Sequence, residues 1–348
     1  MKKLVSLFLS FIFLLMPLLL TGCKRGENPS PKSEIYYLYF DTECVITDYA
    51  GLTDKEFDRM CDIVEEELAL YDSLLDIYSS RAGVTNLKDV NDAAGTTVKV
   101  CPELCDFLLY AEEMYDLTGG QVNVALGSVL SLWHAEREAA KLPGAEPKLP
   151  DEEALYEAVL HTDIENLIVD KAASTVRLGD PDMSLDVGAL GKGYAAKKIL
   201  ERLEEAGFSR FILNLGGNVS ASGVKPNGDK FVAGIKNPNP TSSLDRYTAR
   251  LELCDKSLST SGDYERFYTV LGIEYHHIID PDTLFPSVGF RSVTVLGADP
   301  SVTDALSTAL FTMSIESGRA LAKELGVSVY WILDDGSLEH TSGFKFVK

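Results

Sequence analysis

Between Asp186 and Ala195 the chain reads DVGALGKGYA, and the pattern that follows predicts a helix over residues 194–206. Glycines before a helix let the backbone approach a ligand closely, and the free N–H groups of a helix N-terminus favour phosphate. The run is not a P-loop, because Lys192 is followed by Gly193, and it holds no G-x-G-x-x-G fingerprint. From these residues alone, an anion-binding turn and a purely structural turn both remain open.

Helices and strands around this run mix without a strict βαβ rhythm, which favours an α+β fold over a doubly wound parallel sheet. Apolar residues at helical spacing predict a long helix opened by Thr53 and another that begins at Pro102 and stops before Gly119. Residues 135–150 are charged and contain prolines, so we expect a surface excursion there. Further helices are predicted after Asp151 and over 301–313 and 316–325, and strands over 35–47, 167–169, 175–178, 211–215, 231–235, 247–253, 275–279, 292–296 and 327–333.

The composition restricts the class of partner. The 348 residues include 53 acidic and 32 basic side chains, for a formal net charge of −21. This acidity argues against nucleic acid, because binding a phosphate backbone needs a basic surface. A bound anion must be held by local backbone N–H groups, a local lysine or a metal ion. Six cysteines are too few for a disulfide scaffold, and Cys101 and Cys105 are predicted to be free thiols, because a bridge within one helical turn would be strained.

The N-terminus has the layout of a secretory signal, with two lysines before an almost entirely apolar run over residues 4–20. The run ends in the sequence LTGC, whose last residue is Cys23 and which resembles the bacterial lipobox. We therefore expect a signal peptide over residues 1–22, lipidation of Cys23, a flexible tether over 23–34 and one domain over 35–348. The predicted location is the extracytoplasmic face of the bacterial cell membrane, with an uncleaved anchor helix as the alternative.

Asp304 and Thr308 lie four residues apart, on one face of a predicted helix. Two oxygen-bearing side chains stacked in this way suit a hard cation such as Mg²⁺. Ser301 with Asp304 also reads as a helix start similar to a capping box. The alternative for the carboxylate is structural, because the helix dipole favours an aspartate in a first turn.

His276 and His277 adjoin at the end of a predicted strand that breaks at Asp280-Pro281. A histidine at a strand end is well placed for proton transfer near neutral pH. The alternative is one surface and one core histidine, produced by simple alternation. The small hydroxyls of residues 260–264, TSGDY, are typical of a loop that lines a ligand, and also of any loop.

These stretches occur in one order, and together they resemble the ApbE family of FAD:protein FMN transferases over residues 36–335. The family's aspartate–glycine–KGYA segment is similar to residues 186–195, and its strand-end NxGG to residues 214–217. Residues 119–133 resemble the segment usually read as GGAFDxTVGxLxxLW. The C-terminal signature is matched by TSGDY over 260–264, HIIDP over 277–281, SVTV over 292–295 and DALST over 304–308.

The resemblance implies Mg²⁺-dependent transfer of FMN from FAD to a Thr or Ser hydroxyl of an acceptor protein, with release of AMP. The implied acceptor is an extracytoplasmic redox protein of the membrane or surface. By position, His277 would be the catalytic base, and the metal ligands would be Asp304, Thr308 and the Ala189 carbonyl. The residues expected to contact FAD are Phe40, Gln121, Val122, Asn123, Asp186, Lys192 and the backbone of Ile279.

Two stretches depart from the family pattern. Phe40-Asp41-Thr42 stands where the family has Met-Gly-Thr, and Gln121-Val122-Asn123 stands where it has Ala-Phe-Asp. Both line the isoalloxazine side in the family, so the flavin half is modified while the metal half matches. Two further hypotheses stay open on this ground: an FAD pyrophosphatase that releases FMN and AMP, and a flavin-binding lipoprotein without turnover.

Overall fold

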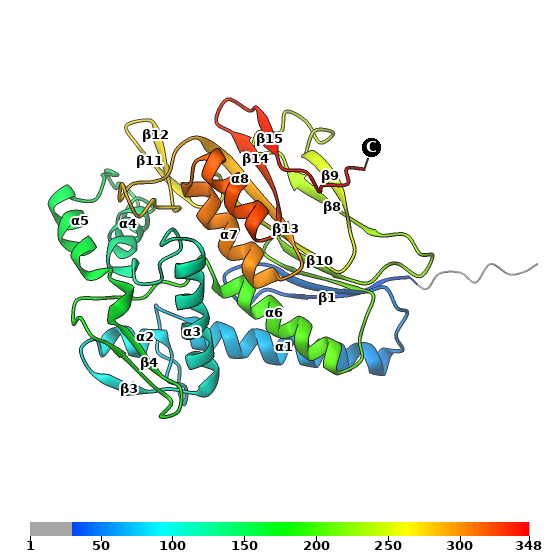
Figure 1. The fold of residues 1–348 in the computed structure, drawn as a ribbon, viewed down its shortest axis with the longest axis horizontal. Helices are drawn as coiled ribbons and strands as arrows, with labels where there is room; N and C mark the ends of the chain where they lie inside the picture. The colour runs from blue at the N-terminus through cyan, green and yellow to red at the C-terminus, as the bar shows by residue number, and fades with distance from the viewer. Residues whose placement is uncertain (1–29, 348) are drawn as a thin grey trace, which may run out of the picture.

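The computed structural model describes residues 30–347, and its centre is an eight-stranded sheet (Figure 1). Every neighbouring pair in this sheet is antiparallel. In spatial order the strands are β1 (Lys32–Tyr36), β2 (Cys44–Asp48), β6 (Phe211–Leu215), β7 (Asn218–Ser222), β10 (Lys256–Gly262), β13 (Phe290–Gly297), β14 (Ser328–Leu333) and β15 (Leu338–His340). The predicted α+β class is confirmed.

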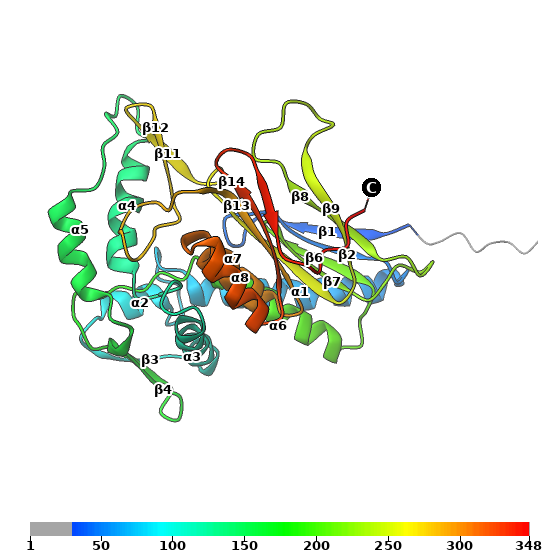
Figure 2. The same ribbon diagram turned by 45° about the horizontal axis from the view of Figure 1, so that its top comes forward.

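Different elements cover the two faces of the sheet (Figures 1 and 2). One face carries the helices α1 (Asp54–Leu75), α6 (Gly191–Glu205), α7 (Pro300–Thr312) and α8 (Ile315–Glu324), and the other carries the hairpin of β8 (Phe231–Lys236) and β9 (Tyr247–Leu253). The period of two along a strand produces this division. Val293 and Val295 pack with α7 and α8, whereas Leu296 packs with the β8–β9 hairpin.

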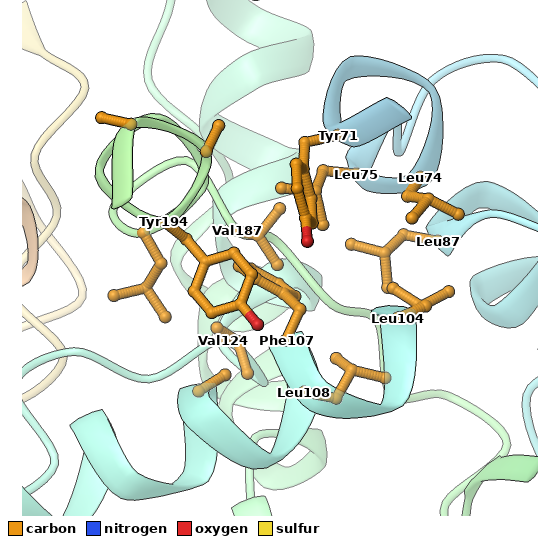
Figure 3. Close-up of a cluster of buried hydrophobic side chains, with 14 of the residues drawn as sticks. Tyr71, Leu74, Leu75, Leu87, Leu104, Phe107, Leu108, Val124, Val187 and Tyr194 are labelled. Atoms are coloured by element: carbon orange, nitrogen blue, oxygen red, sulfur yellow. The ribbon is translucent and has the colours of Figure 1, made fainter. Parts of the chain in front are cut away.

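The rest of the chain forms a region beyond one end of the sheet. Its elements are α2 (Leu87–Asp92), α3 (Pro102–Leu117), α4 (Gly127–Ala139), α5 (Glu152–Ala158), two single 3-10 turns (Val159–His161 and Ile164–Asn166), the small sheet β3 (Thr97–Lys99)–β5 (Thr175–Leu178)–β4 (Leu167–Asp170), and the hairpin of β11 (Phe267–Val270) and β12 (Ile273–His276). One hydrophobic cluster joins this region to α1 and α6 (Figure 3). Within it the Tyr194 ring meets the rings of Tyr71 and Phe107 edge-on, at centroid distances of 5.5 and 5.1 Å.

Several predicted elements have the expected position, and some boundaries differ. Thr53 opens α1 through a complete capping box, and Cys101 and Cys105 are free thiols as predicted. α7 is capped by Asp299, so the expected cap at Ser301 is wrong and Asp304 lies in the second turn. The pattern missed the cap because Pro300, at the first helical position, moves the helix start one residue earlier.

Other boundaries differ because tertiary pairing extends or shortens a local pattern. β1 starts at Lys32, ahead of the expected start of the domain, because residues 32–36 pair with β2. α4 runs on to Ala139, so the excursion begins later than 135. α6 begins at Gly191, and residues 260–262 end the strand β10 instead of forming a loop.

The predicted signal peptide, Cys23 and most of the tether lie outside the described residues. Within residues 30–347, no helix has both the length and the apolar character needed to cross a membrane.

A glycine fixes how α4 meets the segment that leads into the glycine-rich run. A Cβ at Gly127 would lie 2.3 Å from the Ser184 carbonyl oxygen, and Leu126 forms an isolated parallel bridge with Ser184. We expect Gly127→Ala to lower the free energy of unfolding by about 2–3 kcal/mol, because backbone must shift to admit the methyl group. Urea unfolding measures this, with Ser131→Ala on the exposed side of the same helix as the control. Equal stability of the two variants would contradict the expectation.

Candidate active site

Asp304 is the residue around which the candidate site is built. The residue is 5% exposed, and its Oδ2 accepts a 2.6 Å hydrogen bond from the Gly193 N–H. Gly193 is the third residue of α6, whose own N-cap residue, Leu190, provides no side-chain cap. A carboxylate of α7 therefore caps α6, where it also meets the positive end of the helix dipole.

The contact between these two helices requires a glycine. A Cβ at Gly193 would lie 2.3 Å from the Asp304 Cβ and 2.6 Å from the Pro300 carbonyl oxygen. The glycine-rich run thus has a structural role at Gly193, and the same geometry directs the first N–H groups of α6 toward a buried carboxylate.

Hydroxyl groups at the contact between α7 and the sheet fix the position of Thr308. Ser259 of β10 hydrogen-bonds to Thr303 of α7 at 2.9 Å. Two residues further along the strand, Ser261 meets both Ser307, at 2.8 Å, and Thr308, at 3.3 Å. The alternation of β10 places these hydroxyls on one face. They hold α7 in one register, so that Asp304 and Thr308 follow each other along the same helix face.

Ala189 precedes Leu190, the N-cap residue of α6, so its carbonyl lies outside the hydrogen-bond pattern of the helix. No described residue donates a hydrogen bond to this carbonyl. With the Asp304 carboxylate and the Thr308 hydroxyl, the donor set consists of oxygen atoms only. Oxygen donors are what Mg²⁺ and Mn²⁺ prefer, so the three residues fit a hard divalent cation.

Polar groups beside Asp304 are available to an anion. Burial raises the pKa of the Asp304 carboxyl, and the positive charge of the nearby Lys192 opposes that rise. Lys192 is half-buried, and among the described residues it forms no ion pair. The Asn218 amide is buried beside the Asp304 carboxylate, whose pKa it helps to lower. A lysine that forms no ion pair among the described residues is suited to phosphate oxygens.

Asp186 is the first residue of the glycine-rich run, and its side chain forms a turn with Gly188. Its Oδ1 accepts a 2.8 Å hydrogen bond from the Gly188 N–H, and its own N–H donates to the Val124 carbonyl at 2.8 Å. Burial raises the pKa of the Asp186 carboxyl, while the Gly188 N–H and the positive charges of Arg137 and Arg266 oppose the rise.

The two histidines have different roles, as the alternation of β12 indicates. His276 ends the strand, and both of its ring nitrogens are used: Nδ1 accepts from the Ile278 N–H at 3.2 Å, and Nε2 donates to the Ser287 carbonyl at 2.8 Å. His277 follows the strand, and its Nδ1 lies 3.2 Å from the Arg266 carbonyl. A carbonyl only accepts, so Nδ1 carries the hydrogen and the Nε2 lone pair of His277 is free.

Burial, with the charges of Arg266 and Arg137, lowers the pKa of His277 to about 3. The ring is therefore neutral at physiological pH, and its free nitrogen can accept a proton. Neutrality and the fixed tautomer together give His277 the form that a general base requires.

The two stretches that depart from the family pattern, residues 40–42 and 121–123, contact other parts of the protein. Phe40 has a φ of 54°, and its N–H donates to Asp72 Oδ1 at 2.7 Å. Thr42 packs against the turn that follows β6, where a Cβ on Gly216 would lie 2.4 Å from its Oγ1. The Phe40–Thr42 stretch thus packs against the turn at Gly216 and Gly217.

Residues 121–123 are largely engaged by the protein itself. Gln121 accepts from Thr312 at 2.6 Å and donates to Asp282 at 3.3 Å. The Val122 side chain is 3% exposed and belongs to the core. Asn123 bonds to the Thr162 carbonyl and to the Ala125 N–H, each at 2.9 Å. Gln121 ties this stretch to α7, which brings it toward the end of the helix that carries Thr308.

Ile279 also belongs to the protein's own packing. Its side chain is buried, and the residue forms an isolated antiparallel bridge with Pro286. The expected contact between the Ile279 backbone and FAD stays a prediction.

Two arginines, Arg137 and Arg266, and His134 lie near the site and were not singled out from the sequence. Arg137 of α4 donates to His134 Nδ1 at 2.9 Å, and the Tyr78 ring lies on His134 at a centroid distance of 5.0 Å. The charges of Arg137 and Arg266 act on both Asp186 and His277. In the sequence, residues 134–137 (HAER) are typical of a solvent-exposed helix face. Only the packing of α4 against residues 184–186 turns it toward the site.

The fold and this site place the chain in the class of flavin-transferase folds. The ApbE protein of Thermotoga maritima has a TM-score of 0.76 at 25% identity, over 90% of this chain and 97% of that one. The flavin transferase ApbE of Vibrio cholerae has the same fold, with a TM-score of 0.71 at 23% identity over 90% of this chain and 97% of that one.

Sequence comparison gives the family. The sequence model of the ApbE family matches residues 40–331. A Treponema pallidum protein named FAD:protein FMN transferase is 31% identical over 296 residues, which cover 80% of this chain and 79% of the relative. The chain belongs to the ApbE family, as its motifs predicted.

The low pKa of His277 has a consequence for stability. The unfolded chain takes up a proton there below about pH 6.5, whereas the folded chain stays neutral down to about pH 3. Stability is therefore complete above pH 6.5 and is lost as the pH falls through this window. Between pH 7 and pH 5 we expect wild type to lose about 1–2 kcal/mol more than His277→Gln, by urea unfolding at both values. Parallel losses in the two proteins would contradict the assignment of a neutral ring.

Proposed function

We propose that this ApbE-family enzyme transfers FMN from FAD to a threonine or serine hydroxyl of an acceptor protein, in a Mg²⁺-dependent reaction that releases AMP. The observation that supports this proposal most directly is the arrangement of residues where α6 meets α7. Asp304 is buried against Gly193, and Thr308 lies one turn further along α7. Ala189 and Lys192 stand on either side of the start of α6, and Lys192 forms no ion pair among the described residues. The relative from Treponema pallidum, named FAD:protein FMN transferase, supports the same activity.

The pyrophosphate of FAD is proposed to lie at the N-terminus of α6. Lys192 offers a charge that forms no ion pair among residues 30–347, and the helix start attracts anions. These local groups explain how a chain with a net charge of −21 would hold a doubly charged group. Asp304, Thr308 and Ala189 would hold Mg²⁺. When bound, the cation would neutralise pyrophosphate charge and polarise phosphorus.

The proposed chemical step forms one bond and breaks one bond. The acceptor hydroxyl oxygen attacks the phosphorus of the FMN half, and the bond from that phosphorus to the bridging oxygen breaks. AMP leaves with the bridging oxygen. The hydroxyl proton passes to the free Nε2 of His277 and from there to solvent, while the Arg266 carbonyl keeps the ring oriented through Nδ1. Negative charge of bound pyrophosphate favours the protonated ring at that moment.

Asp304→Asn tests the metal role separately from the structural role. The amide oxygen can still accept from Gly193, so we expect the variant to fold, but a charged ligand is lost. Transfer should fall by about 100-fold or more, with weaker Mn²⁺ binding by electron paramagnetic resonance. The assay follows FMN-sized mass gain on a purified acceptor domain with a threonine at its flavinylation site, and release of AMP.

Asp151→Asn is the matched control, because it makes the same change at the cap of α5, where asparagine caps equally well. Wild-type AMP release without mass gain would favour the pyrophosphatase. FAD that stays intact with wild-type protein and Mg²⁺ would favour the binding protein. Unchanged transfer by Asp304→Asn would exclude the metal role.

We also propose that the protein is a lipoprotein on the extracytoplasmic face of the cell membrane, anchored through Cys23. The support is the sequence of residues 1–23, with its two lysines, apolar run and LTGC end. Membrane attachment through lipid would place the enzyme beside extracytoplasmic redox proteins that carry flavin.

Cys23→Ser tests the anchor. The variant keeps the apolar run but loses the thiol that would be acylated, so we expect an uncleaved precursor without lipid. Metabolic labelling with a palmitate analogue, read with intact mass, measures this. Cys254→Ser, at another free cysteine, should keep the label. Lipid on the Cys23→Ser protein would contradict the assignment.

A further inference from the structure

The hairpin β11–β12 projects beside α4 (Figures 1 and 2). His277, the proposed base, directly follows it. Arg266 precedes β11 and His277 follows β12, and the His277 N–H donates to the Arg266 carbonyl at 3.0 Å. That same carbonyl also receives the His277 Nδ1 hydrogen. The hairpin therefore holds the tautomer and orientation of the ring.

The hairpin and the segment before β13 expose large apolar side chains, which we call the apolar rim: Phe267, Leu271 and Ile273 on the hairpin, and Val288 in the segment. Leu271 is 100% exposed, Val288 84% and Ile273 59%. Phe267 is paired directly with His276, and Val288 follows Ser287, whose carbonyl receives the His276 Nε2 hydrogen. Two members of the rim thus flank the histidine next to His277. The register places Phe267 and Ile273 on opposite faces of the hairpin, so the rim is not one continuous patch, and Leu271 at the tip is its most exposed member.

The tip of the hairpin has a sequence that its own fold does not favour. Leu271 and Gly272 have φ values of 50° and 86°, a turn with both central residues left-handed. Such turns favour Asn-Gly, and a leucine there is strained. Leu271 gains neither burial nor good backbone geometry in this protein alone. Its strain and exposure together point to a contact with another molecule.

The hairpin is itself rigidly supported. Trp133 of α4 stacks on Tyr275 at 6.1 Å and meets Tyr268 at 6.4 Å, and the Trp133 Nε1 donates to the Leu284 carbonyl. The exposed side chains are thus presented on a fixed platform and are not the product of a loose loop.

We infer that the apolar rim is the docking surface for the acceptor protein, an inference that rests on the proposed function. The acceptor hydroxyl must reach His277 Nε2, so the acceptor has to stand against the element that carries His277. The four residues of β12 separate Gly272 of the tip from His277, a span of about 16 Å. This distance lies within the footprint of an ordinary protein–protein contact.

Other occupants are less compatible with the rim. An anionic lipid surface would be repelled by a chain with net charge −21, and Glu274 follows Ile273 within the rim itself. A second copy of this chain carries the same charge and would have to cover the path to His277 Nε2.

Leu271→Asn tests the inference. It introduces the pair that this turn prefers, so we expect an unchanged or higher Tm, while an apolar anchor is lost. KM for the acceptor domain that wild type modifies should rise about tenfold, with kcat and FAD binding, read by flavin fluorescence, unchanged. Leu244→Asn is the matched control, a 93% exposed leucine in the loop between β8 and β9, and should keep the wild-type KM.

An acceptor KM for Leu271→Asn within twofold of wild type would overturn the inference. If this variant also loses co-sedimentation with vesicles of phosphatidylglycerol and phosphatidylcholine, the rim is assigned to lipid. If it instead loses a dimer that wild type shows in light scattering, the rim is assigned to a second copy. Failure of the proposed function is seen separately, because wild type itself would then transfer no FMN.

Discussion

One hydrogen bond, from the Gly193 N–H to the Asp304 carboxylate, joins the two halves of this site. α6 lacks a cap of its own, so its N-terminus depends on a residue 111 positions further along the chain. The contact is possible only because position 193 has no Cβ. The same bond places the Asp304 carboxylate at the start of α6, which the Ala189 carbonyl directly precedes in sequence. A structural cap and the proposed oxygen ligands are thus linked through one interaction.

The sheet provides the register for this contact. Ser259 and Ser261 of β10 hold α7 through three hydroxyl contacts, which fix where Asp304 and Thr308 stand along the helix. The opposite face of the same sheet packs mainly apolar residues against the β8–β9 hairpin, and there Thr260 and Thr294 bond to each other at 2.9 Å. Mutual bonding of the hydroxyls on both faces offsets the cost of their burial.

Local patterns predicted much of this architecture and part of the site. Thr53, Pro102 and Asp151 mark helix starts through their own side chains, and each was found where the sequence placed it. The family membership also followed from ordered motifs. The pairing of Asp304 with Gly193 could not be predicted from pattern, because it joins residues far apart in sequence. Arg137 was missed for the same reason, since its helix face reads as solvated until α4 packs on residues 184–186. The flavin contacts expected at Phe40 and at residues 121–123 stay predictions.

The placement of β1 bears on how far the enzyme can reach. β1 lies at an edge of the sheet, and the hairpin β11–β12 lies at the other end of the molecule (Figures 1 and 2). A chain held at a surface through the segment before β1 would present the hairpin at its distal end. Under the proposed lipid anchor, the length of the protein would then act as a spacer. The hairpin could reach an acceptor domain that stands well above the lipid headgroups.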